Sequence, residues 1–455
     1  MATKRLKLLD IVLLNVVAVT SLRWLASAGA AGPSSLSLWV LAALFFFLPQ
    51  GLAVAELSLR SPGEGGLYRW TKEALGERNG FLCGWCYWVN NIIYFPSLLI
   101  YVSGNIALAV QTLHPEWALE KNSDFVILCT LICLWLVAGV SILGLNWGRR
   151  LQNFGAVANW IPAAAIVGLG TAAYFAFGVA NPINFQTVLP KLSSFGEWSY
   201  FAQICFALAG LELVSFFEGD AENPRRTVPL AIGIAAVLIL AVYIFGTIGI
   251  LVSVPKEQLT AVNGVLLPIQ QISAKFGAGW IGTVCAFLIV AAGLGAVLAW
   301  FTGAARVPYL VGVDRYLPKS FGKLHPKLGT PVTAILVQTA VASLLTLFAT
   351  AGSVRFEATY KILVDMCLIL YFIPYLYLFL SVPKLAPNAK KPVLYLSWVG
   401  LAVTAIAILT TAFPTGAAID YVGLAKTLGG TAVMLCVGMI LYTVAHRRQL
   451  RISDR

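Results

Sequence analysis

The chain has 455 residues, of which 59% are hydrophobic and 11% charged, with a net charge of +12 and a mean hydropathy of +0.84. A soluble globular chain is nearer about 45–50% apolar and about 25% charged, so this composition excludes an ordinary soluble enzyme. The basic residues are scattered through short loops without a basic domain, so the positive charge does not indicate nucleic-acid binding.

Twelve apolar runs follow one another along the chain, and each has the roughly 20 residues that a helix needs to cross a hydrocarbon core of about 30 Å. The composition therefore predicts one all-α integral-membrane domain. The first run follows three basic residues, as in a signal peptide, but eleven further runs favour an uncleaved membrane helix. The runs cover approximately residues 10–30, 36–59, 81–110, 124–144, 153–178, 199–218, 229–252, 277–303, 331–350, 359–381, 394–413 and 425–446.

The orientation in the membrane follows from the Lys and Arg residues of alternate loops, because cytoplasmic loops carry an excess of them. With both termini inside, 23 of the 31 basic residues fall on the cytoplasmic side and seven on the other. This split predicts a multi-pass protein of the cytoplasmic membrane with both termini in the cytoplasm. The seven outer residues are Lys121, Lys191, Lys256, Lys275, Arg355, Lys361 and Lys426.

Arg23 is the one basic residue that this topology does not explain, because it falls inside the first apolar run. An Arg near the middle of a membrane helix costs roughly 2.5–3.5 kcal/mol on insertion scales, and such a residue usually faces an interior or a wet cavity. Snorkelling of the side chain from a helix end is the alternative interpretation.

Two of the runs contain features that interrupt a membrane helix. Residues 19–24 combine two hydroxyl residues with Arg23, and residues 206–212 combine Gly210 with the acid Glu212. Transporters place binding sites at such interruptions, because the freed backbone groups then bind substrate, ion or water. The two segments lie in runs one and six, the first helix of each of two five-helix halves. Because runs one to five start inside and runs six to ten start outside, the topology predicts that the two halves are inverted repeats.

The sequence has few residues that could bind a metal or a cofactor or hydrolyse ATP. The eight cysteines lie in apolar runs, and the three histidines lie in loops or at run ends, so we expect no metal site and no cofactor. The sequence contains no P-loop. If the chain is a transporter, its energy must therefore come from an ion gradient or from exchange, and Glu212 or Asp365 would have to carry any proton.

At four places the sequence resembles the amino acid–polyamine–organocation (APC) transporters. Residues 206–212, followed by 222–229, are similar to the sixth-helix signature of that family. Residues 55–57 and 62–76 resemble its second helix and the following loop, and residues 306–314, 317–318 and 325–331 resemble the loop between helices eight and nine. The glutamate:GABA-antiporter-like branch is the most similar, because its first-helix break also lacks the usual Gly-rich run.

The resemblance implies the LeuT fold, with 12 transmembrane helices arranged as a 5+5 inverted repeat plus two. The repeats would cover residues 1–180 and 195–382, and the extra helices 390–446. The resemblance also implies alternating access of an amino acid to a site at the membrane midplane. By position, the substrate would meet Val19, Thr20, Ser21, Leu22, Leu208, Ala209, Gly210 and Leu211, together with Asn91 and Tyr94 of the third helix.

The chain departs from the family pattern in three ways. Leu208 and Leu211 stand where many members have an aromatic gate residue, the first break lacks the Gly-Ser-Gly pattern, and run five has no Lys that replaces sodium. Arg23 has three possible roles: a gate pair with Glu212 or Asp365, an anchor for the substrate carboxylate, or a substitute for a coupling cation. Glu56 is interpreted as structural, near the cytoplasmic end of run two.

The sequence thus predicts a secondary active amino-acid transporter, proton-coupled or driven by exchange. A polyamine or cationic amino-acid carrier is the alternative, which an uncompensated Arg23 disfavours. Two alternatives from other classes of protein are a membrane-embedded enzyme and a non-transporting amino-acid sensor. The enzyme would need a cluster of acids or histidines at a membrane edge, and none stands out.

Overall fold

The computed structural model describes residues 7–61, 65–117, 119, 122–143, 145–190, 195–212, 224–304, 316–351, 356–411 and 420–453. Within these ranges the protein is helical and contains no strand. Ten of the described helices are long and apolar enough to cross a membrane. They agree with ten of the twelve predicted runs.

The described residues of the first half form ten α-helices, and a π-helical turn at Ala43–Phe47 joins α3 to α4. Their bounds are α1 (Leu8–Val19), α2 (Leu22–Ala31), α3 (Ser35–Ala42), α4 (Leu48–Arg60), α5 (Gly66–Leu75), α6 (Glu77–Leu113), α7 (Ser123–Leu143), α8 (Leu145–Phe177), α9 (Phe185–Val188) and α10 (Phe195–Ala207). The second half continues with α11 (Pro224–Ser253), α12 (Leu266–Lys275), α13 (Trp280–Ala304), α15 (Val332–Thr350), α16 (Phe356–Leu385), α17 (Lys391–Thr411) and α18 (Tyr421–Ser453).

The two runs predicted to be interrupted are interrupted. The first divides into α1 and α2 at Thr20 and Ser21, and Ser21 has extended backbone angles of φ −135° and ψ 129°. The sixth stops being α-helical after Ala207, and its predicted continuation from residue 213 lies outside the described residues. The motif residues 62–64, 222–223 and 306–314 also lie outside them.

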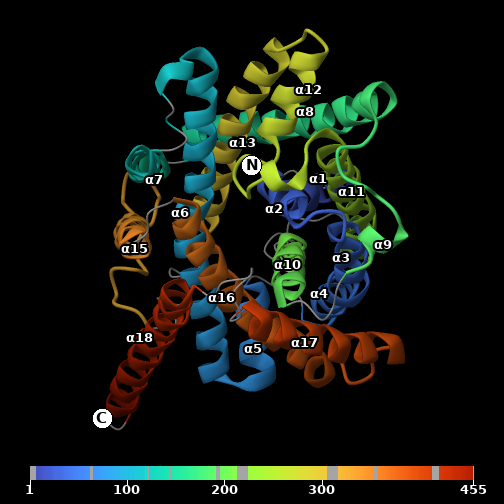
Figure 1. The fold of residues 1–455 in the computed structure, drawn as a ribbon. Coiled ribbons are helices and arrows are strands. Elements are labelled where there is room, and N and C mark those ends of the chain that lie inside the picture. The colour runs from blue at the N-terminus through green and yellow to red at the C-terminus, as the bar shows by residue number, and fades with distance from the viewer. Residues whose placement is uncertain are drawn as a thin grey trace.

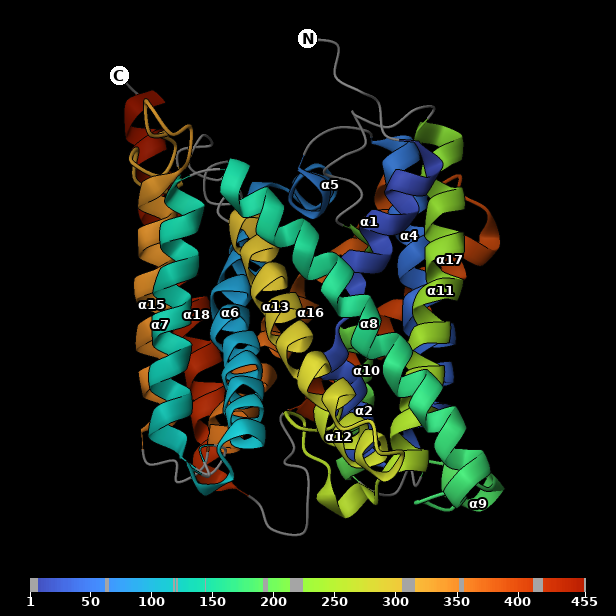
Figure 2. The same ribbon diagram turned by 90° about the horizontal axis from the view of Figure 1, so that it is seen from above.

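The interrupted helices lie in the interior of the bundle. Figure 1 shows α10 in the middle, with α2 above it, α3 and α4 on its right, and α6 and α16 on its left. Both α2 and α10 are shielded from the bilayer by the longer helices around them. Figure 2 shows the start of α1 and the end of α18 at the same end of the bundle, as an even number of membrane crossings requires.

Small residues allow the helices around this interior to approach closely. A Cβ atom on Gly249 of α11 would lie 2.5 Å from the Ile166 carbonyl oxygen of α8, and one on Gly155 of α8 would lie 2.8 Å from the Cα of Gly295 in α13. Packing of this kind holds membrane helices together, because lipid supplies no hydrophobic drive between them.

Candidate functional site

Tyr243 of α11 bridges the break in the first helix. Its hydroxyl donates to the Val19 carbonyl oxygen at 2.7 Å and accepts a hydrogen bond from the Ser21 backbone N–H at 3.1 Å. The Ala207 carbonyl oxygen, at the end of α10, is 3.3 Å from the same hydroxyl. One buried side chain therefore satisfies backbone groups at both interruptions.

Gln50 of α4 and Tyr375 of α16 hold the break after α10. Gly210 has φ +127°, a conformation that side chains with a Cβ rarely adopt, and its N–H donates to the Tyr375 hydroxyl at 2.9 Å. The surroundings of Gln50 orient its amide oxygen toward the Leu211 N–H (3.1 Å) and its amide nitrogen toward the Leu208 carbonyl (3.3 Å). Side chains of the protein therefore occupy the freed donors of this break.

Glu212 follows this break and is completely buried. Its carboxylate accepts hydrogen bonds from the hydroxyls of Tyr371 (2.6 Å) and Tyr375 (2.5 Å), and the Tyr87 hydroxyl lies 3.5 Å away. The carboxylate thus joins the sixth helix to α16 and α6.

The central cavity lies between the two breaks, with a volume of about 30 Å³. It has room for about two waters and is too small for an amino acid in this conformation. Its lining comes from both interrupted helices and from α6, α13 and α16. The lining residues are Val19, Trp24, Asn90, Asn91, Tyr94, Phe206, Ala207, Ala209, Trp300 and Tyr371.

Four of the predicted site residues line the central cavity, and the others lie beside it. Val19, Ala209, Asn91 and Tyr94 are in the lining. Five more, which take part in the breaks without lining the cavity, are Thr20, Ser21, Leu208, Gly210 and Leu211; Leu22 begins α2.

Sequence reasoning missed most of the aromatic lining. Phe206 lies two residues before Leu208, where many family members have an aromatic residue. Its ring packs edge-on against those of Trp24 and Tyr371, with ring centres 5.3 Å and 5.1 Å apart. Tyr371 also binds Glu212, so it touches both the cavity and the buried acid. Phe206 belongs to the sixth-helix motif, so the signal was present there, whereas Trp300 and Tyr371 have no local sequence signal.

Arg23 is completely buried, which excludes snorkelling. Its guanidinium carbon lies 4.1 Å from the centre of the Trp24 ring and 4.4 Å from that of Tyr94, and Nη1 donates to the Ser97 hydroxyl at 3.1 Å. Its Nε and Nη2 find no acceptor among the described residues. Two cation–π contacts of about 2 kcal/mol each and one hydrogen bond only partly offset the several kcal/mol needed to desolvate a cation.

The buried acids have partners other than Arg23 in this conformation. Asp365 forms an ion pair with Lys361, one turn earlier on α16, while Glu212 is held by tyrosines. The proposed gate pair between Arg23 and either acid is therefore not formed here. Glu56 pairs with Arg60 at 3.0 Å at the end of α4, as a structural role predicts.

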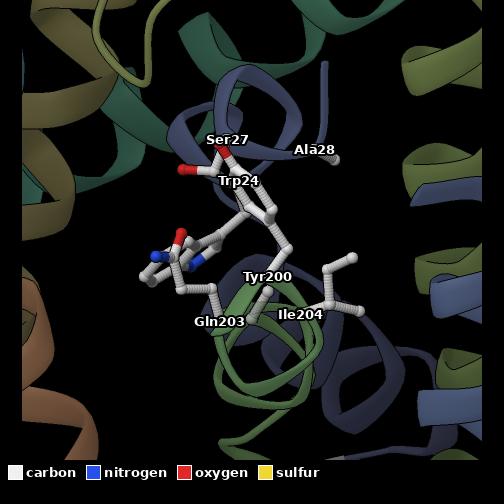
Figure 3. Close-up of a pocket in the computed structure, with 7 residues that line it drawn as sticks. Trp24, Ser27, Ala28, Tyr200, Gln203 and Ile204 are labelled. Atoms are coloured by element: carbon white, nitrogen blue, oxygen red, sulfur yellow. The ribbon is translucent and has the colours of Figure 1, made fainter. Parts of the chain in front are cut away.

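A narrow crevice between α2 and α10 adjoins the central cavity, because Trp24 and Ala207 line both. Figure 3 shows Trp24 and Ser27 of α2 facing Tyr200, Gln203 and Ile204 of α10. Ser34, after α2, donates to Glu197 of α10 at 3.1 Å. These contacts hold α2 against α10 beside the central cavity.

The loop at the opposite end is also held by polar contacts. The Trp70 indole donates to the Ser61 carbonyl at 3.0 Å, and Arg69 pairs with Glu73 at 2.6 Å. Partial burial raises the pKa of Glu73, but the hydrogen bonds from Ser61 and Arg69 outweigh burial, and the pKa lies below its ordinary value. The Trp70 contact holds α5 against the end of α4.

The comparisons with known proteins agree with this geometry. The model of the amino acid permease family matches residues 6–443. The chain belongs to this family. The permease is therefore a multi-pass membrane protein and a secondary amino-acid transporter.

Relatives and a solved structure support the assignment. The permease is 28% identical to the probable agmatine/putrescine antiporter of Lactococcus lactis over 81% of this chain and 77% of the relative. It is 25% identical to the glutamate/gamma-aminobutyrate antiporter of the same species over 75% of this chain and 68% of the relative. The crystal structure of MhsT in complex with L-phenylalanine superimposes with a TM-score of 0.61 at 12% identity, covering 88% of this chain and 98% of that one. This likeness confirms the predicted LeuT-type fold.

Proposed function

We propose that the permease carries an α-amino acid through the central cavity by alternating access, driven by exchange or by a proton gradient. The observation that carries this proposal is the meeting of both helix breaks at one central cavity. Val19 and Ala207, which end α1 and α10, both line it. A site at this place becomes accessible from either side when the helix halves move.

The backbone at the cavity suits the two charged groups of an amino acid. α2 begins at Leu22, and the first N–H groups of a helix lack intrahelical acceptors and carry partial positive charge, which favours a carboxylate. The carbonyl groups of Val19 and Ala207 end their helices and retain lone pairs for an ammonium. The rings of Trp24, Phe206 and Trp300 would then surround the substrate side chain.

The protein would lie in the cytoplasmic membrane with both termini inside. The excess of basic residues in alternate loops supports this orientation, and the placement of α1 and α18 at one end of the bundle is consistent with it.

Counterflow in proteoliposomes tests the proposal. Vesicles containing the purified permease are loaded with one unlabelled amino acid at a time, and entry of the labelled amino acid is followed with and without an inward proton gradient. We expect entry above that of protein-free vesicles for at least one amino acid. No accumulation and no exchange for any of the twenty would overturn the proposal and favour a sensor or an enzyme.

A polyamine carrier is the second candidate, because one relative is named as an agmatine/putrescine antiporter. The aromatic lining of the cavity would bind an alkylammonium by cation–π contacts. Against this, no carboxylate is among the lining residues, and Arg23 stacks on two of them. Putrescine that exchanges faster than every amino acid would favour this candidate.

A further inference from the structure

Several buried hydrogen-bond donors gather beside the central cavity without an acceptor. Among the described residues, Nε and Nη2 of Arg23 and the hydroxyls of Ser27, Tyr101 and Tyr360 have no hydrogen-bond partner. The side chains of Arg23, Ser27, Tyr101 and Tyr360 are 5% exposed or less. We propose that these four residues form a buried anion-binding site.

Three helices bring these donors together. Arg23 and Ser27 lie one turn apart on α2, and Tyr94, Ser97 and Tyr101 follow one face of α6 at spacings of three and four residues. The 3.1 Å hydrogen bond from Arg23 to Ser97 and the ring contact with Tyr94 join the two faces. The Tyr360 hydroxyl of α16 lies next to that of Ser27. Tyr101 and Tyr360 both lie close enough to Arg23 to interact electrostatically with its charge.

The balance of charges and protons favours an anion. A hydrogen bond between the neighbouring hydroxyls of Ser27 and Tyr360 would use only one of their two protons, and the other would still lack an acceptor. The acid that lies nearest along α16, Asp365, is held by Lys361 and so does not compensate Arg23. A small anion supplies a negative charge and several acceptor positions at once, which a neutral ligand does not.

Two sources carry this chemistry: a free halide such as chloride, or a carboxylate on the side chain of the substrate. The site adjoins the substrate cavity, because Trp24 and Tyr94 contact Arg23 on one side and line the cavity on the other. An anion bound to Arg23 would therefore fix two walls of the substrate site. Only the carboxylate source rests on the proposed function; halide binding does not need it.

The first arm of the test measures equilibrium binding of radiolabelled chloride to the purified full-length protein without amino acids, at constant ionic strength kept with gluconate. The variants Tyr101→Phe and Tyr360→Phe each remove one O–H group and keep the ring. We expect each to weaken chloride binding about tenfold or more, because a hydrogen bond to a charged group is lost. Tyr395→Phe, at a hydroxyl on the exposed face of α17, is the matched control.

The second arm compares glutamate with glutamine, which has the same shape without the charge, in chloride-free buffer. If the anion is the substrate carboxylate, both variants lose about tenfold in glutamate affinity and keep their glutamine affinity. Thermal melting of each variant without ligand shows whether it is folded.

The two arms give different results for a bound halide, a bound substrate carboxylate and no anion site. Chloride binding that both variants weaken, or a loss confined to glutamate, supports the site and identifies its source. Chloride and glutamate affinities equal to those of the parent in both folded variants, or no binding of either anion to the parent, overturn the proposal. Counterflow of any amino acid is scored separately, so failure of the transport proposal is not confused with failure of the anion site.

Discussion

The hydroxyl of Tyr243 donates to the Val19 carbonyl across 2.7 Å, so α11 holds open the break in the first helix. The two residues are 224 positions apart in the chain. The Tyr243 ring stacks on Trp39 with centres 4.3 Å apart, which fixes the direction of the hydroxyl. The backbone groups freed at this break are thus hydrogen-bonded by one side chain that is distant in the sequence.

Tyr243→Phe tests this dependence. The change keeps the ring stacking but leaves the Val19 carbonyl and the Ser21 N–H without this partner, at a cost of about 1–3 kcal/mol for a buried group. We expect a lower melting temperature and an exchange rate at least tenfold below that of the parent. Tyr174→Phe, at an exposed hydroxyl of α8, is the control for both measurements. Parental exchange by Tyr243→Phe would contradict the proposed role.

Gly210→Ala tests the geometry of the second break. At φ +127° a residue with a Cβ is strained by about 1–3 kcal/mol, and the added Cβ would lie 3.3 Å from Val19 Cγ2 at the first break. We expect loss of exchange together with a lower melting temperature. Gly139→Ala, on α7 with open space around the new Cβ, should transport like the parent. Equal behaviour of the two variants would show that the close approach of the breaks is unimportant.

Glu212→Gln tests whether the buried acid carries a proton. Gln has nearly the same size and still accepts one hydrogen bond from Tyr371 or Tyr375, but it does not titrate. We expect counterflow to persist while acceleration by an inward proton gradient disappears. Glu56→Gln removes an acid that pairs with Arg60 at the end of α4 and should keep the acceleration. A gradient response that survives in Glu212→Gln assigns the proton elsewhere.

The sequence predicted both helix breaks because each has a local cause. Thr20 and Ser21 carry hydroxyls that compete for backbone groups, and the Thr20 hydroxyl bonds to the Val16 carbonyl. Gly210 permits a backbone angle that other residues avoid. Ten of the twelve predicted crossings also match spanning helices among the described residues, because bilayer thickness sets the length of an apolar run.

The contacts that complete the site were not predictable in the same way. Gln50, Tyr243 and Tyr375 reach the breaks from helices far away in sequence, and an apolar run does not reveal which of its faces points inward. Arg23 shows the limit most clearly. Its burial could be expected from its cost, but its stacking between Trp24 and Tyr94 depends on the packing of α2 against α6.

Arg23 provides the last prediction. Arg23→Ala removes the charge and the stacking between two cavity walls, so we expect exchange to fall below detection while expression stays near that of the parent. Arg23→Lys keeps the charge but loses the planar fork, so it should retain only a small part of the exchange rate. Arg226→Ala, at the exposed start of α11, is the matched control. Because Arg23 is completely buried, parental exchange by Arg23→Ala would mean that neither its charge nor its ring contacts serve transport.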